Sequence, residues 1–237
     1  MSCFRVRAVV GSLATLVVVS FLLSAAIKAQ ASTILGTGTG ALLGGDLTDP
    51  ENDGLPDADV NYNATFFSSD EPGFGGGEFA FNVFDNLVGG GNAKWCCGTN
   101  FPQTVGAILA QPHFLSHFTL TSGNDTDGRD PRVFTIDGSN DGVNWTPIFS
   151  RTDANTSDWT ARDQVIRYDA GPDFAAPAAY SQFRMNTTAT GLVGGAFFQL
   201  NEIEFFGNPV PEPSTLVLAG LGLIGLVGFG WRRRVRR

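Results

Sequence analysis

The sequence predicts an all-β fold, an antiparallel β-sandwich of the jelly-roll type. Between about residues 60 and 207, short apolar or aromatic runs are separated by clusters of Gly, Asn and Asp. Helical periodicity is absent from this part of the chain, and alternation is clearest in "VFTID", where Phe134 and Ile136 should face one way and their neighbours the other. Many short strands with such turns are typical of sandwiches and jelly rolls.

The N-terminal segment has the pattern of a secretory signal peptide. Arg5 and Arg7 precede a long apolar stretch, which is followed by small residues at Ala29 and Ala31. A basic start, an apolar stretch and small residues at the cleavage site are the three parts of such a signal. We expect residues 1–31 to be removed after Ala31, and the rest of the chain to be exported.

The C-terminal segment has the pattern of a membrane span. The run from Leu216 to Trp231 carries no charge and ends at a block of five arginines. A helix that crosses a bilayer needs roughly 17 to 25 apolar residues, so this run is at the short end of that range. Arginines tend to stay on the cytoplasmic side, which agrees with export of the preceding domain. The alternative is a buried core helix.

The residues before this run carry a recognisable motif. "VPEPST", an apolar span and "WRRR" together resemble the PEP-CTERM sorting signal of Gram-negative and related bacteria, with Pro211, Glu212 and Pro213 matching its signature. The resemblance covers residues 209–237. It implies cleavage near the tripeptide by an exosortase, so that the chain is anchored in the inner membrane only in transit and reaches the cell surface or extracellular matrix.

The charge of the chain limits its partners. Removal of both ends takes away eight of 15 basic residues and one of 23 acidic residues, which leaves a net charge of about −15. Binding to nucleic acid requires a basic surface, so nucleic acid is not expected as a partner. An acidic surface of this kind favours cations.

The middle of the chain shows a second resemblance. "TSGNDTDGRDPRVFTIDGSNDGVNW" is similar to the middle of a discoidin or coagulation factor 5/8 type C domain, a galactose-binding-like jelly roll. "FNVFDNLVGGGNAKW" resembles the early loop of that family, and "FQLNEIEFFG" resembles its closing strand. The resemblance covers residues 61–208. Asn86 departs from the usual Gly, and the glycines from Gly89 to Gly91 enlarge the early loop.

Such domains bind ligands with the variable loops at one end of the sandwich. The resemblance therefore implies a noncatalytic protein that binds carbohydrate or exopolysaccharide, because exposed aromatic rings stack on sugars and polar groups bind their hydroxyls. The alternative is a structural matrix component without a saccharide site. A hydrolase is disfavoured, since no Gly-x-Ser-x-Gly motif or convincing acid/base pair is present. The candidate ligand-binding residues are Trp159, Arg162, Phe74 and Arg129.

The remaining tryptophans of the domain, Trp95 and Trp145, are expected in the core. The role of Trp159 stays open between stacking on a ligand and covering a loop.

A calcium site is implied at the early loop. In related domains a Phe-Asp loop and the first Glu of the closing strand hold a structural ion, and Asp85 and Glu202 match those places. Calcium takes six to eight oxygens, so we expect help from the Phe84 carbonyl, Asn92 and the backbone near Ala93. The alternative is that Asp85 caps a turn and that Glu202 is solvated.

Residues 32–60 are rich in glycine and acidic side chains, and we expect a linker with little core. Its acidic residues are spaced around Gly54 much as in some calcium loops, although Val60 stands where an EF-hand has Glu. A second calcium site and a solvated acidic linker both remain open. The acidic residues concerned are Asp49, Glu51, Asp53 and Asp57.

Two cysteines remain after removal of the signal peptide, and they are adjacent. Export favours a disulfide, but the α-carbons of consecutive residues are about 3.8 Å apart, closer than in most disulfides. The sequence leaves open whether Cys96 and Cys97 form a vicinal disulfide or two separate thiols.

Overall fold

A computed structural model of the protein describes residues 32–50, 62–71, 73, 76–191, 197–211 and 215–235. The predicted signal peptide lies outside the described residues. The elements are β1 (Thr33–Thr37), η1 (Thr39–Ala41), β2 (Ala64–Ser68), η3 (Ala80–Phe84), β3 (Trp95–Cys96), β4 (Gln103–Thr121), η4 (Asp127–Arg129), β5 (Pro131–Ser139), β6 (Thr146–Arg151), β7 (Gln164–Asp169), β8 (Ala179–Thr190), β9 (Gln199–Leu200), β10 (Glu202–Pro209) and α1 (Thr215–Val235).

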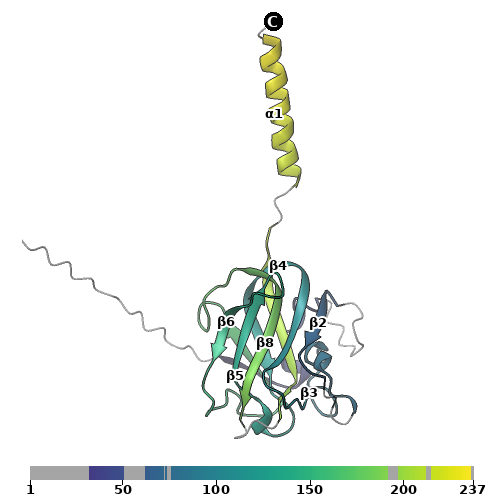
Figure 1. Ribbon diagram of the computed structural model, residues 1–237, viewed down its shortest axis with the longest axis vertical. Coiled ribbons are helices and arrows are strands. Elements are labelled where there is room, and N and C mark those ends of the chain that lie inside the picture. Colours follow the sequence, from purple (N-terminus) through teal and green to yellow (C-terminus); the bar gives the residue numbers. More distant parts are fainter. Residues whose placement is uncertain are drawn as a thin grey trace, which may run out of the picture.

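The strands form a curled antiparallel sheet, which confirms the predicted β-sandwich class (Figure 1). The first half of β4 pairs with β2 and β8, and β8 continues through β5 to β6. The second half of β4 pairs with β10 and β7, and β1 is added at the edge. A bulge between Ile108 and His113 separates the two halves of β4, so that this one long strand pairs with β2 and β8 before the bulge and mainly with β10 and β7 after it. The short strands β3 and β9 form a separate pair.

The register defines two ends of the domain. At one end, Glu202 of β10 pairs with Thr121 of β4; at the other, Pro209 pairs with His113, and the chain leaves toward α1. The first end carries β3 and lies opposite α1 (Figure 1). We call these the loop end and the helix end.

Aromatic side chains dominate the core. Phe134 and Ile136 are buried and the residues between and before them are half-buried, so the predicted alternation in β5 is confirmed as far as Ile136. Asp137 is buried as well, since the pairing with β6 shifts register between Ile136 and Asp137. The rings of Phe118 and Tyr168 stack with centroids 4.8 Å apart. Apolar burial of this kind is the main term that stabilises a fold of this size. Trp95 is fully buried, as predicted.

The prediction of a linker over residues 32–60 is wrong for residues 32–50. β1 pairs with β7, and the backbone N–H of Leu47 donates to the carbonyl of Phe205 at 2.8 Å. Asp46 and Asp49 are buried. This segment therefore belongs to the domain, because Asp46 accepts hydrogen bonds from backbone amides and Asp49 accepts one from the side-chain amide of Asn86. Residues 51–61, with most of the proposed acidic calcium loop, lie outside the described residues.

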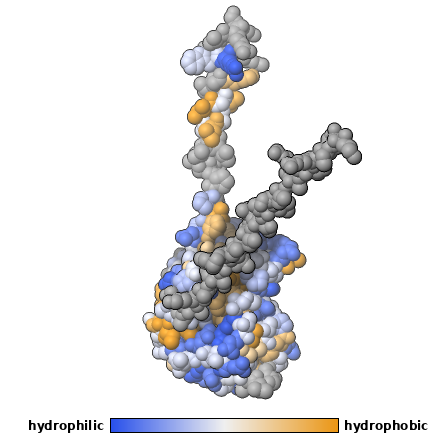
Figure 2. Space-filling view, turned by 90° about the vertical axis from the view of Figure 1, so that its left-hand side faces the viewer, coloured by the Kyte–Doolittle hydropathy of each residue, from blue (hydrophilic) through white to orange (hydrophobic). Residues whose placement is uncertain are grey.

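The C-terminal helix α1 forms where the apolar run was predicted, and hydrophobic side chains are exposed along it (Figure 2). Leu223, Ile224 and Trp231 are among its exposed apolar residues. Its last turns take in Arg232 to Arg234. The predicted membrane span is not found: no helix in the described part of the chain has both the length and the apolar character needed to cross a membrane.

Candidate functional site

The predicted cation ligands Asp85 and Glu202 are brought together at the loop end. Asp85 ends the helix η3, and Glu202 is the first residue of β10. The backbone N–H of Asn86 donates to Oε1 of Glu202 at 3.4 Å. Asn86 has a φ of 59°, in the left-handed region that Asn adopts more readily than most residues, which explains how it replaces Gly there.

The two carboxylates are buried beside each other. Asp85 is 4% exposed and Glu202 is 1% exposed. Burial, followed by the negative charge of Asp85, raises the pKa of Glu202 well above its usual range. Burial also raises the pKa of Asp85 to about 7. Oε2 of Glu202 has no hydrogen-bond partner among the described residues. A hard cation would neutralise both groups and supply the missing partner, so the pair fits calcium.

Two further carboxylates, Asp46 and Glu204, lie close enough to raise the pKa of Glu202. Both already bind protein donors. Oδ2 of Asp46 accepts from the N–H of Phe205 at 3.2 Å, and Glu204 accepts from the N–H of Gly44 and the hydroxyl of Thr119, each at 2.6 Å. They therefore contribute charge, while the free acceptor is Oε2 of Glu202. Asp46 was not predicted as part of the site, because the composition of its segment is typical of a linker.

The other expected calcium ligands differ. Phe84 is the last residue of η3 and directly precedes Asp85, so its carbonyl lies in the same loop as the Asp85 carboxylate. Asn92 is exposed and lies against Gly77, and its carbonyl accepts from the N–H of Lys94 at 2.7 Å. Ala93, which stands between Asn92 and Lys94 in the chain, is half-buried. These contacts tie Asn92 to the neighbouring loop, so they do not support Asn92 or Ala93 as ligands.

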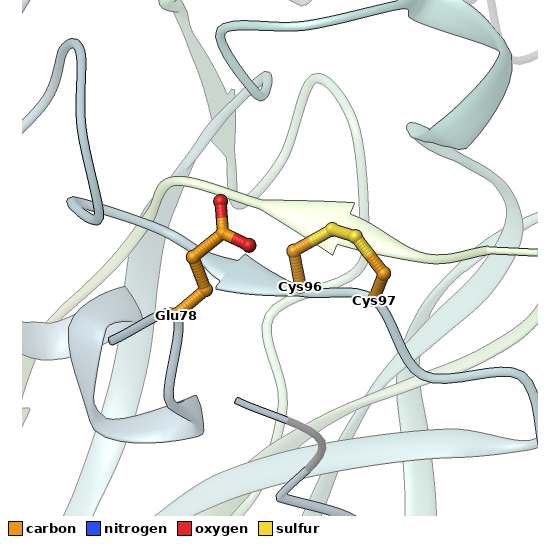
Figure 3. Close-up of side chains that lie close together, drawn as sticks. All are labelled: Glu78, Cys96 and Cys97. Carbon is orange, nitrogen blue, oxygen red and sulfur yellow. A yellow bond between two sulfur atoms is a disulfide. The ribbon is translucent and has the colours of Figure 1, made fainter. Parts of the chain in front are cut away.

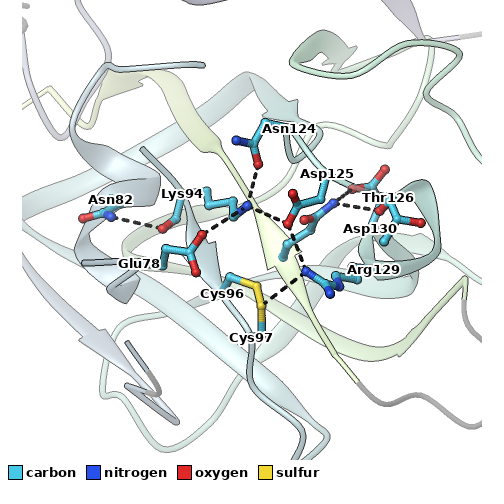
Figure 4. Close-up of a disulfide and its surroundings, with 11 residues drawn as sticks. Glu78, Asn82, Lys94, Cys96, Cys97, Asn124, Asp125, Thr126, Arg129 and Asp130 are labelled. Atoms are coloured by element: carbon cyan, nitrogen blue, oxygen red, sulfur yellow. Dashed lines mark hydrogen bonds and ion pairs between the residues drawn. A yellow bond between two sulfur atoms is a disulfide. The ribbon is translucent and has the colours of Figure 1, made fainter. Parts of the chain in front are cut away.

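Cys96 and Cys97 are joined by a vicinal disulfide, which answers the question that the sequence left open. The guanidinium of Arg129 lies beside the disulfide, with Nη1 3.8 Å from Sγ of Cys97 (Figure 4). The same guanidinium lies over the ring of Phe197, 5.3 Å from the ring centroid. Nη1 also pairs with Asp125 at 2.9 Å. The disulfide thus forms part of a packed surface at the loop end.

A buried lysine connects this surface to the early loop. Nζ of Lys94 lies 3.1 Å from Oε1 of Glu78 and 2.8 Å from Oδ2 of Asp125, and it also donates to Asn124 (Figure 4). The hydrogen bond from Lys94 is the main reason that the pKa of Asp125 is lowered. The paired charges let the lysine remain buried.

The residues predicted to bind carbohydrate are placed as follows. Trp159 is only 3% exposed, and its Nε1 donates to the carbonyl of Leu120 at 3.4 Å. The indole packs into the core, so its ring is not exposed for a ligand to stack on. Arg162 pairs with buried Asp130 at 2.6 Å, so it is already engaged. Arg129 remains partly exposed beside the disulfide. Phe74 lies outside the described residues.

Trp145 contradicts its predicted core position, because it is half-exposed on the sheet. It precedes β6, and its Nε1 donates to the carbonyl of Gly142 at 3.1 Å. The guanidinium of Arg184 on β8 covers the indole at 4.1 Å, and the ring of Phe67 on β2 lies 5.9 Å away. We call Trp145, Arg184 and Phe67 the aromatic platform.

The sheet beneath the platform explains its geometry. Gly106 on β4 pairs with Arg184 and with Phe67, and a Cβ at this glycine would lie only 2.5 Å from the Phe67 ring. The glycine therefore lets the ring lie over β4. Nε of Arg184 pairs with Asp137 at 2.8 Å, while its Nη groups make no hydrogen bond within the described residues. They are free to donate to a ligand.

A pocket of about 270 Å³ adjoins the platform through Phe67. Its polar groups are the hydroxyl of Ser68 and the carboxylate of Glu71, which accepts from the N–H of Ala80 at 2.8 Å. An aromatic wall with a few polar groups is the usual composition of a sugar site. The pocket is lined by Phe66, Phe67, Ser68, Glu71, Ala80, Phe81 and Val105.

The sorting motif follows the last strand. Pro211 is exposed after β10, and Glu212 and Pro213 lie outside the described residues. α1 begins at Thr215.

Comparison with known proteins gives two family matches. The model of the F5/8 type C domain matches residues 63–188, more than half of the chain. The model of the PEP-CTERM protein-sorting motif matches residues 209–234. No curated protein matches the chain.

Several solved carbohydrate-binding modules are similar in fold. CpGH89CBM32-5 from Clostridium perfringens, in complex with GalNAc-beta-1,3-galactose, has 18% identity and a TM-score of 0.46, covering 61% of this chain and 96% of its own. The family 32 module of NanJ from the same organism, in complex with galactose, has 19% identity and a TM-score of 0.44, with 60% and 93% covered. Chitosan-binding module 1 from a Paenibacillus sp. IK-5 chitosanase/glucanase has 24% identity and a TM-score of 0.44, with 61% and 96% covered.

Proposed function

Because the chain belongs to the F5/8 type C domain family and carries a PEP-CTERM sorting motif, we propose that it is a noncatalytic carbohydrate-binding protein of the cell surface or extracellular matrix. In this proposal an exosortase processes the chain during sorting, and the domain then binds carbohydrate, in particular exopolysaccharide.

The observation that carries the proposal is the aromatic platform. Trp145 and Phe67 offer apolar ring surface to the faces of pyranose rings, and the Nη groups of Arg184 offer donors to sugar oxygens. The adjoining pocket adds a hydroxyl and a carboxylate. The platform crosses β2, β4 and β8, so binding would use the sheet face and not the loop end.

Binding to an array of polysaccharides, which includes the exopolysaccharide of the producing organism, tests this function. We expect saturable binding that falls about five- to 150-fold in Trp145→Ala, if stacking of a sugar on the ring contributes roughly 1 to 3 kcal/mol, as stacking of a nucleic-acid base does. Phe114→Ala is the matched control, since Phe114 is an exposed aromatic residue near the helix end.

Arg129→Ala separates the two surfaces. Loss of binding in that variant, with Trp145→Ala unaffected, would move the site to the loop end. The alternative function is a structural matrix component without a saccharide site. Absence of binding to every polysaccharide on the array would favour it.

A calcium ion held by Asp85 and Glu202 is part of the proposal. The Phe84 carbonyl adjoins the pair and would supply a further ligand. The ion would neutralise two buried carboxylates and fasten the early loop to β10. Its role would be structural, because it stabilises the loop end without contacting the aromatic platform.

The sorting motif predicts removal of the C-terminal segment. Intact-mass analysis of protein recovered from the cell surface should give a chain that ends near Pro211 and lacks α1 with its arginines. Glu212→Ala should accumulate as full-length precursor, whereas Glu71→Ala, outside the motif, should be processed normally. Recovery of the full-length wild-type chain at the surface would contradict processing.

A further inference from the structure

The vicinal disulfide lies beside a buried carboxylate. A carboxylate oxygen of Glu78, Sγ of Cys96 and Sγ of Cys97 all lie within 4.8 Å of one another, and in the described part of the chain this is the one such group of three potential metal ligands (Figure 3). All three residues are buried, and Figure 3 shows the Glu78 side chain directed toward the sulfur of Cys96. The side chains therefore converge on one point.

Glu78 has an unused ligand atom. The residue is 7% exposed, and its Oε1 lies 3.1 Å from Nζ of Lys94. Its Oε2 is buried and has no hydrogen-bond partner among the residues that the structure describes. A buried carboxylate oxygen without a partner is unfavourable, and the pairing of Oε1 with Lys94 leaves that cost in place. A bound cation would remove it.

The backbone holds these residues in position. The N–H of Cys96 donates to the carbonyl of Glu78 at 3.2 Å, and Cys96 pairs with Gln199 of β9. The ligand set thus comes from two adjacent segments that are already bonded to each other. Little ordering of the chain would be needed to bind an ion, which lowers the entropic cost of the site.

We propose that reduction of the Cys96–Cys97 disulfide creates a site for a thiophilic divalent cation such as Zn²⁺, with Cys96, Cys97 and Glu78 as ligands. A dithiol reductant supplies two electrons and two protons, is itself oxidised to a disulfide, and leaves two thiols on the protein. Binding of the cation forms two metal–sulfur bonds and releases the two thiol protons. Zinc takes four ligands, so water completes the set.

One cation lies beside the cysteines. Nη1 of Arg129 is 3.8 Å from Sγ of Cys97. Positive charge near a thiol favours its ionised form, which is the form that binds metal. Since a disulfide offers no thiolate, the oxidised protein binds no metal here. Metal binding and the disulfide therefore exclude each other, and this site is independent of the carbohydrate-binding proposal.

Titration with Cd²⁺ as the probe tests the proposal on the mature protein. After reduction by a phosphine, which takes up oxygen from water and leaves no competing thiol, we expect thiolate-to-metal absorbance in the ultraviolet that saturates at one Cd²⁺ per chain. Protein that has not been reduced should give none. Excess Zn²⁺ should displace Cd²⁺ and abolish the absorbance. Absence of the absorbance in reduced wild type, or an equal signal without reduction, would overturn the proposal.

Variants identify the ligands. Glu78→Gln keeps the shape and the backbone bonds and should weaken Cd²⁺ binding about tenfold or more, because loss of even an indirect partner of a metal ligand costs that much. Asp153→Asn, which removes an exposed carboxylate outside this group of three, is the matched control and should bind as wild type. Circular dichroism checks that both variants are folded. If folded Glu78→Gln binds Cd²⁺ as tightly as wild type, Glu78 is not a ligand and the proposed site is wrong.

Discussion

Chelation of calcium is expected to lower the melting temperature of the mature protein by roughly 5 to 10 °C. A ligand present at one hundred times its dissociation constant stabilises the folded state by about 2.7 kcal/mol, and 1 kcal/mol shifts the midpoint by about 2 to 4 °C at this size. The physical cause is the acidic pair. Without an ion, Asp85 and Glu202 remain buried together with Oε2 of Glu202 unpartnered within the described structure.

Asp85→Asn removes one charge of the pair and should lose most of the calcium effect. Its own stability in chelator should equal or exceed that of wild type, because the remaining carboxylate no longer faces a buried negative charge. Asp127→Asn, which removes an exposed carboxylate, is the matched control and should respond to calcium as wild type. Calorimetry with and without calcium measures the melting temperature of both variants and of wild type. An equal calcium response in Asp85→Asn would place the ion elsewhere.

The stability of the calcium-free protein should fall as the pH rises. Burial raises the pKa of Asp85 to about 7 and raises the pKa of Glu202 well above its usual range, so the folded state holds protons that the unfolded state has lost. Stability from such groups is fully present below their unfolded pKa of about 4 and is lost as the pH rises through the folded value. Each proton contributes about 1.4 kcal/mol per pH unit.

Melting curves between pH 5 and 8 measure this dependence. In chelator, the midpoint should fall toward pH 7 by about 3 to 6 °C per pH unit for each of the two protons, since one proton corresponds to about 1.4 kcal/mol per unit. With saturating calcium, the slope should largely disappear, because above pH 5 neither the ion-bound folded state nor the unfolded state holds these protons. Glu202→Gln should flatten the slope in chelator. A midpoint that rises with pH in chelator would show that the pair does not titrate as its burial requires.

The strand pattern and the three family motifs together were enough to predict the fold. Alternation placed Phe134 and Ile136 in the core, and the Phe-Asp loop and closing strand located the pair Asp85 and Glu202 correctly. These features could be predicted because each depends on a short local pattern. The remaining ligand residues depend on how separate loops pack together, and no local pattern records that packing.

The two loop tryptophans illustrate this limit. Trp159 and Trp145 both stand in polar, turn-rich segments, yet Trp159 packs beneath the sheet against Leu120 and Trp145 lies half-exposed on it. Two residues determine the position of Trp145. Gly106 makes room for the neighbouring ring of Phe67, and Arg184 covers the indole of Trp145. Both residues come from strands distant in the sequence.

The N-terminal segment illustrates the same limit in polar residues. Glycine and acidic side chains predicted a solvated linker, but Asp46 is buried because its carboxylate accepts hydrogen bonds from the backbone of Thr48, Asp49 and Phe205. The amino-acid composition shows which side chains are charged, but it does not show which hydrogen-bond donors surround a carboxylate in the folded protein.

Isothermal titration of the mature protein with the exopolysaccharide of its own producing organism tests the central claim most directly. Wild type and Phe114→Ala should give the same saturable heat, and Trp145→Ala should give a dissociation constant about five- to 150-fold weaker, as expected for loss of one stacking ring. Equal binding by Trp145→Ala and wild type would contradict the aromatic platform, and absence of heat from wild type would contradict carbohydrate binding itself.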